Sequence, residues 1–287
     1  MTGESDNRQH EAGRDEVMRI TSLRNPRVKY AAKLRDRRPR ERTGEFLVEG
    51  YRCIRRALDA GFPLRQLFSC PELFQGENEE SLIAACRGAG VEVMQVPAHV
   101  FHKLAYRDRP EGLLALAPQR RRRLGEVKLR DPSFVLVAES IEKPGNLGTM
   151  LRSADAAGVD LMVLCDSVTD LFNPNVVRAS TGALFSVPFA EAAADEALDW
   201  LRGRNMRLFA ATPHAENLYT EVDMTVPMAV LVGSEQFGLS DTWLSRADVH
   251  VRIPMMGMAD SLNVSTATSL LLYEVLRQRM AGGLIEV

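Results

Sequence analysis

The chain has 287 residues, of which 45% are hydrophobic and 26% charged, a composition typical of a globular protein with about two domains. No apolar run approaches the roughly 18 residues that cross a bilayer, and the segment from Met1 to Ala12 is polar rather than a secretion signal. The four cysteines are scattered and form no Cys-x-x-Cys pair, which excludes a disulfide framework and a cysteine-rich metal site. We therefore expect a cytoplasmic protein that binds neither a membrane nor a metal.

Charge is distributed unevenly along the chain. Residues 1–130 contain 26 Lys and Arg against 18 Asp and Glu, whereas residues 131–287 contain 10 against 20. Basic side chains are densest from residue 14 to residue 56, a segment that contains 14 basic and 6 acidic residues. Such a surface attracts a polyanion, although a solvated Arg-rich face or a disordered tail gives the same count. The candidates for contact with phosphate groups are Arg24, Arg27, Lys29, Arg37 and Arg38.

The elements of the first half predict a small α/β domain. Residues 1–18 lack hydrophobic periodicity, so we expect a mobile tail there. From residue 46 onward, short apolar runs alternate with amphipathic stretches, which predicts alternating strands and helices. The predicted strands are 45–49, 64–69, 91–96 and 112–117, and the predicted helices are 50–60 and 79–88.

Four consecutive arginines, residues 120–123, begin a polar stretch that extends to Asp131 and Pro132. We place the domain boundary in this Arg-rich linker, residues 120–131. It separates a basic region, 19–119, from a C-terminal domain, 132–287. The arginines either contact nucleic acid or keep the linker solvated and extended.

Beyond residue 132 the alternation becomes stronger. Continuously apolar strands such as 134–137 and 229–232 are typical of parallel strands that helices cover on both faces. We predict an α/β fold with a parallel sheet flanked by helices, and we expect its function in the loops that follow the strands. The predicted strands are 134–139, 161–165, 207–211, 228–233 and 249–253, and the predicted helices are 146–157, 174–184, 193–204, 240–246 and 264–280.

The first candidate loop, residues 142–152, joins a buried strand to a helix. Asn146 is suited to cap that helix, Gly148 permits close approach of the backbone, and Arg152 lies one turn further along. A helix start beside a guanidinium group binds anions. Alternatively, Asn146 only caps and Arg152 pairs with a surface carboxylate. The chain has neither a Walker A motif nor a Gly-x-Gly-x-x-Gly motif, which disfavours phosphoryl transfer and an NAD-dependent dehydrogenase.

Two further loops follow predicted strands. Loop 231–240 carries Glu235 beyond the carboxyl end of a buried strand, and Ser240 in the same loop is suited to cap the next helix. Loop 253–265 alternates Met and Leu with amide and hydroxyl side chains, which predicts an apolar slot with hydrogen-bonding groups. A Met-filled gap in the core with an Asn or Ser cap is the alternative.

Three motifs in fixed order carry a resemblance to a known family. They are Asn-x-Gly-x-x-x-Arg at 146–152, Gly-Ser-Glu-x-x-Gly-Leu at 233–239, and Ile-Pro-Met followed by Ser-Leu-Asn-Val-Ser within 253–265. Together they resemble the SpoU (TrmH-type) family of SPOUT RNA 2′-O-ribose methyltransferases. Residues 44–117 are similar, by a weaker pattern, to the L30e-type substrate-binding domain of that family. The resemblance implies a C-terminal trefoil knot, S-adenosylmethionine as the cofactor and a homodimer.

The resemblance also implies roles for individual residues. The cofactor would lie against the backbone of Gly233, Ile253, Met255 and Leu262. The polar active-site positions of the family match Asn146, Arg152, Glu235 and Asn263. We assign Arg152 to an RNA phosphate and to the developing alkoxide, because a guanidinium group does not act as a base.

The implied reaction transfers a methyl group to a ribose 2′-hydroxyl. The basic N-terminal half would hold the RNA, and the additional L30e-like domain favours 23S rRNA over tRNA. Resistance to a ribosome-targeting antibiotic is a role open to such an enzyme. The alternatives are a tRNA 2′-O-methyltransferase and a non-catalytic RNA-binding or ribosome-assembly protein.

Overall fold

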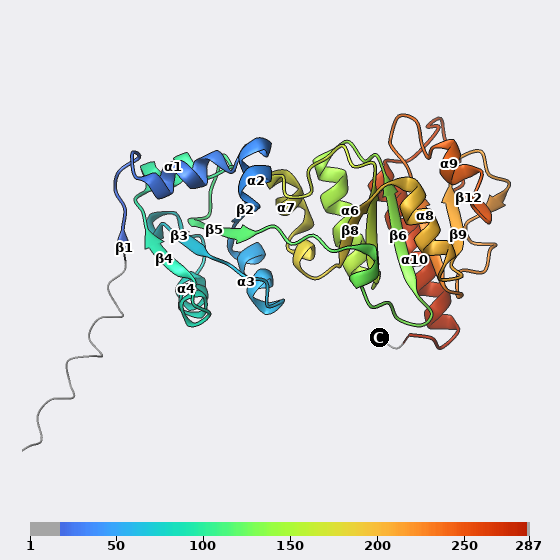
Figure 1. The fold of residues 1–287 in the computed structure, drawn as a ribbon, viewed down its shortest axis with the longest axis horizontal. Helices are drawn as coiled ribbons and strands as arrows, with labels where there is room; N and C mark the ends of the chain where they lie inside the picture. The colour runs from blue at the N-terminus through green and yellow to red at the C-terminus, as the bar shows by residue number, and fades with distance from the viewer. Residues whose placement is uncertain (1–17, 286–287) are drawn as a thin grey trace, which may run out of the picture.

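The computed structural model describes residues 18–285. Two α/β domains lie next to each other along the long axis of the molecule (Figure 1). The predicted mobile tail lies outside the described residues except for Met18, which begins a short strand, β1 (Met18–Arg19).

The N-terminal domain is built on a five-stranded mixed sheet in the order β1-β4-β3-β5-β2. β5 is antiparallel to β2 and β3, whereas β4 is parallel to β1 and β3. Its strands after β1 are β2 (Glu45–Glu49), β3 (Gln66–Ser69), β4 (Glu92–Gln95) and β5 (Leu113–Pro118), and its later helices are α3 (Tyr51–Asp59), α4 (Glu79–Gly88) and α5 (Ala98–Leu104). The predicted strands and helices of this domain are confirmed to within a few residues, and α5 was not predicted.

Between β1 and β2 lie two helices that hydrophobic periodicity did not predict, α1 (Pro26–Lys33) and α2 (Arg37–Thr43). The side chain of Asn25 accepts a hydrogen bond from the backbone of Arg27 at 2.9 Å, which caps α1. α2 has no aliphatic or aromatic side chain and ends at Gly44, whose φ of 65° is left-handed. The start of α1 is therefore marked by Asn25 and the end of α2 by Gly44, whereas no apolar stripe marks α2 itself.

The C-terminal domain contains a seven-stranded, fully parallel sheet in the order β10-β12-β9-β11-β6-β7-β8. This confirms the predicted parallel sheet. The strands are β6 (Phe134–Glu139), β7 (Leu161–Cys165), β8 (Phe189–Ala192), β9 (Arg207–Ala211), β10 (Asn217–Leu218), β11 (Met228–Val232) and β12 (Val249–Arg252). The short strands β8 and β10 were not predicted.

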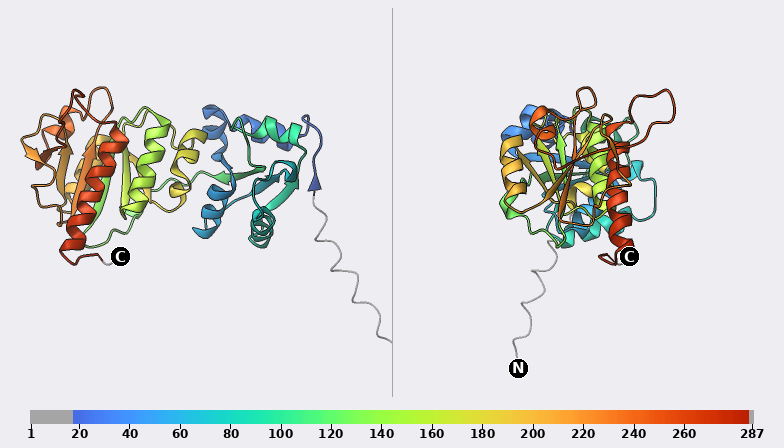
Figure 2. Two further views of the ribbon diagram at one scale, coloured as in Figure 1. Left: turned by 180° about the vertical axis from the view of Figure 1, so that it is seen from behind. Right: turned by 90° about the vertical axis from the view of Figure 1, so that its right-hand side faces the viewer.

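Helices cover both faces of this sheet. The long helix α10 (Val264–Ala281) packs beside α6 (Pro144–Ala156) on one face, as the view from behind in Figure 2 shows. α8 (Ala194–Arg202) and α9 (Asp241–Leu244) lie on the other face. The predicted helix 174–184 ends early: α7 (Pro174–Ser180) stops because Thr181 is left-handed at φ 50°. The trefoil knot that the resemblance implies stays a prediction.

Segment 120–131 lies against the C-terminal domain, while its four arginines are exposed. The guanidinium group of Arg121 lies 5.7 Å from the ring centre of Phe172 and pairs with Glu191. Leu124 and Val127 are buried in the core of the C-terminal domain. Two buried apolar side chains therefore anchor the segment onto the sheet, and contact of its arginines with nucleic acid stays a prediction.

One hydrophobic core extends through both domains. The ring of Phe46 in β2 lies 4.8 Å from that of Phe172, and Phe62 lies 5.0 Å from Phe185. α7 lies between α6 and the N-terminal domain (Figure 1) and contacts both α6 and β2. The N-terminal domain is thus held in one orientation relative to the parallel sheet.

All four cysteines are free and buried. Burial raises the pKa of the Cys165 thiol to about 12 and that of Cys53 to about 11. Because the thiolate is the reactive form, we expect the folded protein to resist an aromatic disulfide reagent at neutral pH, while unfolding in urea releases four reactive thiols. A thiol that reacted rapidly in the native protein would contradict this packing.

Candidate active site

Three of the four predicted polar residues meet at the carboxyl edge of the parallel sheet. Asn146 lies in the first turns of α6, Glu235 in the loop after β11, and Asn263 directly before α10. The amide nitrogen of Asn146 donates to Oε1 of Glu235, and that of Asn263 donates to Oδ1 of Asn146 at 3.1 Å. The three predicted loops are thus joined by a continuous chain of hydrogen bonds.

The starts of α6 and α10 determine the positions of the side chains in this hydrogen-bonded set. Oδ1 of Asn263 accepts hydrogen bonds from the backbone and hydroxyl of Ser265, at 3.1 and 2.6 Å, and so caps α10. α6 begins at Pro144 with Lys143 as its N-cap residue, so the predicted capping role of Asn146 is wrong. A proline in the first turn starts the helix earlier, and the Asn146 side chain is free to contact Glu235.

The turn after β11 is closed tightly around Glu235. Ser234 and Gly238 exchange two backbone hydrogen bonds of 3.0 Å. A Cβ atom on Gly233 would lie 2.1 Å from the carbonyl of Gly238, so only glycine fits there. Within residues 18–285, the buried Oε2 atom of Glu235 has no hydrogen-bond partner. This atom is available to an N–H or O–H group of a ligand.

Glu139 also supports the site, although the sequence analysis did not single it out. It ends β6, is buried, and accepts a hydrogen bond from the backbone of Ser240 at 2.7 Å. This bond ties the loop after β11 to the neighbouring strand. Ser240 occupies the N-cap position of α9 but makes no side-chain capping bond. A carboxylate at the end of an apolar strand was the available signal for Glu139.

Arg152 is exposed on α6 and makes no ion pair or side-chain hydrogen bond within the described part of the chain. The alternative in which it pairs with a surface carboxylate is therefore not observed. Gly148 serves helix packing instead of ligand approach, because a Cβ atom there would lie 2.5 Å from Cβ of Ala179 in α7. Close contact with α7 thus fixes the helix that carries Asn146 and Arg152.

The predicted cofactor contacts lie on the loops after β11 and β12, two strands that β9 alone separates. Gly233 is buried, Ile253 and Met255 are half-buried, and Leu262 is 36% exposed. Accessible apolar side chains beside the polar groups of a loop backbone suit a ligand with an apolar ring and polar ends. The unpartnered oxygen of Glu235 adds an acceptor for an amino or hydroxyl group. These residues fit S-adenosylmethionine.

The five basic candidates are not equivalent. Arg24, Lys29 and Arg38 are exposed and form no ion pair in the described structure, whereas Arg27 pairs with Glu92. Arg37 pairs with Glu41 at 2.7 Å and donates to the backbone oxygen of Val168 at 3.3 Å, which brings it to the domain junction.

Two classes of site are not found in the described range 18–285. It holds no group of three or more His, Cys, Asp or Glu side chains that could bind a metal ion. Among its helices, none is long and apolar enough to cross a membrane.

Comparison with known proteins identifies the family. Residues 133–273 match the SpoU rRNA Methylase family, and residues 25–115 match an MRM3-like substrate binding domain. A 23S rRNA (uridine(2479)-2′-O)-methyltransferase of Streptomyces viridochromogenes is 34% identical over 274 residues, which cover 92% of this chain and 93% of that protein. The chain belongs to the SpoU family. The predicted family, α/β fold and N-terminal substrate-binding domain are confirmed.

Crystal structures of related methyltransferases share the fold of both described domains. A structure described as an RNA 2′-O ribose methyltransferase superposes with a TM-score of 0.81 at 46% identity and covers 92% of this chain and all of its own (100%). An AdoMet-bound rRNA methyltransferase from Sinorhizobium meliloti has a TM-score of 0.82 at 32% identity, and the match covers 91% of this chain and 98% of that one. The SpoU methyltransferase AviRb from Streptomyces viridochromogenes, in complex with AdoMet, has a TM-score of 0.81 at 31% identity. This match covers 90% of this chain and 100% of that one.

Proposed function

We propose that this SpoU protein is an S-adenosylmethionine-dependent 2′-O-ribose methyltransferase that acts on 23S rRNA. The observation that carries the proposal is the hydrogen-bonded set Asn146, Glu235 and Asn263 at the sheet edge. The helix of Arg152, which has no ion pair within residues 18–285, starts at the same edge. The relative from Streptomyces viridochromogenes supports the substrate class, as does a 23S rRNA (guanosine(2553)-2′-O)-methyltransferase of Bacillus subtilis at 28% identity.

Each group of residues has a defined task. When bound, the cofactor supplies an electrophilic methyl group. The backbone of Gly233, Ile253, Met255 and Leu262 holds it, and the free oxygen of Glu235 accepts a hydrogen bond from the cofactor or the RNA. Asn146 and Asn263 keep that carboxylate in place. Orienting the two reactants provides most of the rate acceleration.

Arg152 binds the phosphate beside the target ribose and stabilises the negative charge that develops on the 2′-oxygen. The proton of the hydroxyl goes to another group or to solvent, because a guanidinium group stays protonated in proteins. This division of tasks separates cofactor binding from transfer.

The experiment that tests the function uses methyl-labelled S-adenosylmethionine with unmodified bacterial 23S rRNA, 16S rRNA and tRNA in separate reactions. Mapping the label by reverse-transcription stops at low dNTP concentration is expected to give one ribose in 23S rRNA. Label in tRNA alone would replace this function with that of a tRNA methyltransferase. Cofactor binding without transfer to any RNA would favour a non-catalytic RNA-binding protein.

We also propose a homodimer formed through the outer face of α10. Leu270, Tyr273 and Met280 are 38%, 51% and 44% exposed along this helix, which is unusual for large apolar side chains that share one face. Sedimentation of the wild-type protein is expected to give twice the chain mass, and Tyr273→Asp is expected to give monomers. A monomeric wild type at micromolar concentration would contradict the proposal.

A cytoplasmic location follows from the proposed substrate, since rRNA is made and assembled there.

Resistance to a ribosome-targeting antibiotic such as avilamycin is a proposed consequence of the modified nucleotide. Expression in a sensitive bacterium, with the variant Arg152→Ala as control, tests whether transfer and resistance go together.

A further inference from the structure

A polar cavity of about 330 Å³ lies at the junction of the two domains, apart from the predicted cofactor loops. One wall is α2, which contributes Arg37 and Glu41, and the other is formed at the carboxyl ends of β7 and β8. The lining also includes Arg121, Asp166, Ser167, Thr169, Asp170 and Glu191. Neither domain encloses this space alone, so its shape depends on how the domains meet.

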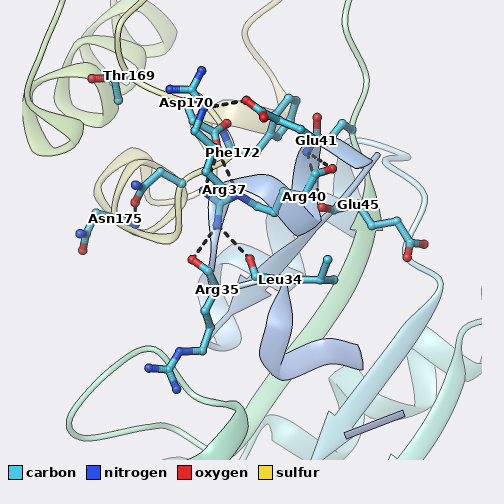
Figure 3. Close-up of polar contacts among 12 residues, drawn as sticks. Leu34, Arg35, Arg37, Arg40, Glu41, Glu45, Thr169, Asp170, Phe172 and Asn175 are labelled. Atoms are coloured by element: carbon cyan, nitrogen blue, oxygen red, sulfur yellow. Dashed lines mark hydrogen bonds and ion pairs between the residues drawn. The ribbon is translucent and has the colours of Figure 1, made fainter. Parts of the chain in front are cut away.

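A buried ion pair fixes that meeting point, as Figure 3 shows. The side chain of Arg40 is only 1% exposed, and its Nε and Nη2 atoms donate to Oδ2 of Asp170 at 2.9 and 2.6 Å. Its Nη1 atom donates to the backbone oxygens of Leu34 and Arg35, at 2.9 and 2.7 Å. Oδ1 of Asp170 accepts a bond from the backbone of Phe172 at 2.9 Å. With these groups satisfied, the cavity is preformed.

Two guanidinium groups face the cavity with donors to spare. Arg37 uses Nε for Glu41 and Nη1 for the backbone oxygen of Val168, which leaves Nη2 without a partner in the described structure. Arg121 uses Nη1 for Glu191 and Nη2 for Gln119, which leaves its Nε without a partner among residues 18–285. Their side chains are 57% and 47% exposed. Both can therefore donate to the oxygens of one phosphate without losing their present partners.

Acceptors are also present in the lining. Asp166 follows β7 in a left-handed conformation, φ 48°, that is unusual for a residue other than glycine, and its carboxylate is exposed and has no ion pair among residues 18–285. Glu41 and Glu191 add two further carboxylates, each already paired with an arginine. A free phosphate would be repelled by this set, and a simple cation would meet two guanidinium groups. A ligand that carries both a phosphate group and N–H or O–H donors matches the guanidinium groups and the carboxylates of the lining.

The cavity is connected to the candidate active site. The hydroxyl of Thr169 in the cavity wall donates to the backbone oxygen of Glu142 at 2.6 Å, just before α6 and Asn146. The backbone of Ser140, at the end of β6, donates to Cys165, at the end of β7, at 2.9 Å. β6 and β7 are adjacent parallel strands, so both places lie on the same sheet edge.

We propose that this cavity binds one unpaired nucleotide of the RNA, a neighbour in the strand of the nucleotide that is methylated. Its phosphate lies between Arg37 and Arg121, and a hydroxyl or base N–H group donates to Asp166. Single-stranded RNA is recognised by such contacts to bases and riboses that are splayed out of a helix. The proposal rests on the proposed function for its RNA substrate and adds a second contact point to it.

The test measures RNA binding by the full chain without cofactor, so that it does not depend on methyl transfer. The probe is the shortest fragment of a 23S rRNA transcript that the wild-type protein retains on a filter. Two variants are compared with it: Ser167→Trp, which fills the cavity, and the double variant Arg37→Ala with Arg121→Ala. Arg87→Ala, at an exposed position of α4, is the matched control. Thermal unfolding and cofactor binding verify that each variant is folded.

Each cavity variant is expected to raise the Kd for the fragment about 10-fold, as expected for the loss of a charge-assisted contact, and Arg87→Ala is expected to leave it unchanged. Single abasic nucleotides placed along the fragment should reveal one position, other than the methylated one, at which wild-type binding weakens. That position should have no effect in Ser167→Trp, because the two changes remove the same contact.

The outcomes separate this proposal from the proposed function. If both cavity variants bind the fragment within twofold of the wild type, the cavity is not an RNA site, whether or not the protein methylates RNA. If their binding falls while no RNA accepts label from S-adenosylmethionine, the cavity site stands and the proposed catalytic function is overturned.

Discussion

Replacement of Arg152 by alanine is expected to reduce methyl transfer to 23S rRNA by about 100-fold to 1,000-fold, the range seen when a group that stabilises developing negative charge is removed. The side chain is exposed and has no partner within residues 18–285, so its loss removes no contact of the folded protein. Affinity for S-adenosylmethionine, measured by calorimetry, and the urea midpoint should therefore remain unchanged.

Two further variants make this test specific. Arg152→Lys retains the charge but not the planar fork of donors, so we expect it to recover only part of the rate. Arg204→Ala removes an exposed arginine in the turn after α8, whose guanidinium group lies 4.1 Å from the ring centre of Trp200, and should leave transfer unchanged. Normal turnover in Arg152→Ala would exclude the proposed role and shift attention to Glu235 as the group that contacts the RNA.

Asp170→Ala is expected to destabilise the protein by about 3–5 kcal/mol, because it leaves the buried guanidinium group of Arg40 without a counter-charge. The pair joins α2 to the loop after β7, with exposed side-chain fractions of 1% and 6%. The free energy of unfolding, obtained from urea titration, is the measurement. In the double variant Arg40→Met with Asp170→Leu no uncompensated charge remains, so much of the lost stability should return.

The matched control is the exposed pair Arg55 and Asp59 on α3, where the side chain of Asp59 is 62% accessible and the two groups lie 3.8 Å apart. Asp59→Ala is expected to cost less than about 0.5 kcal/mol, as is usual for surface pairs. If Asp170→Ala cost no more than Asp59→Ala, the ion pair would not hold the domains together.

The C-terminal domain could be predicted from the sequence because its strands are apolar on both faces. Runs such as Phe134–Glu139 and Met228–Val232 have few alternatives in a globular protein. By contrast, α2 has no apolar stripe, and the side chains that fix it are remote in sequence. Arg40 and Asp170 are 130 residues apart, so local pattern carries no sign of their contact.

For the candidate site, the positions of the loops predicted which residues lie close together but not which hydrogen bonds they form. Asn146, Glu235 and Asn263 come together because three parallel strands end at one edge. That Asn146 contacts Glu235 rather than capping α6 depends on where Pro144 starts the helix, a difference of two residues. Glu139 was missed because its partner is a backbone N–H group, which every residue but proline provides.

The aromatic side chains that pass between the domains bear on how this architecture can change. Phe46 and Phe62 belong to the N-terminal domain, yet they pack against Phe172 and Phe185 of the other. A chimaera that joined this C-terminal domain to the substrate-binding domain of a relative would need to match these four aromatic rings as well as the peptide junction. The shared interior therefore limits which domains can be exchanged, whereas exposed residues on α1 and α2 can be replaced without disturbing it.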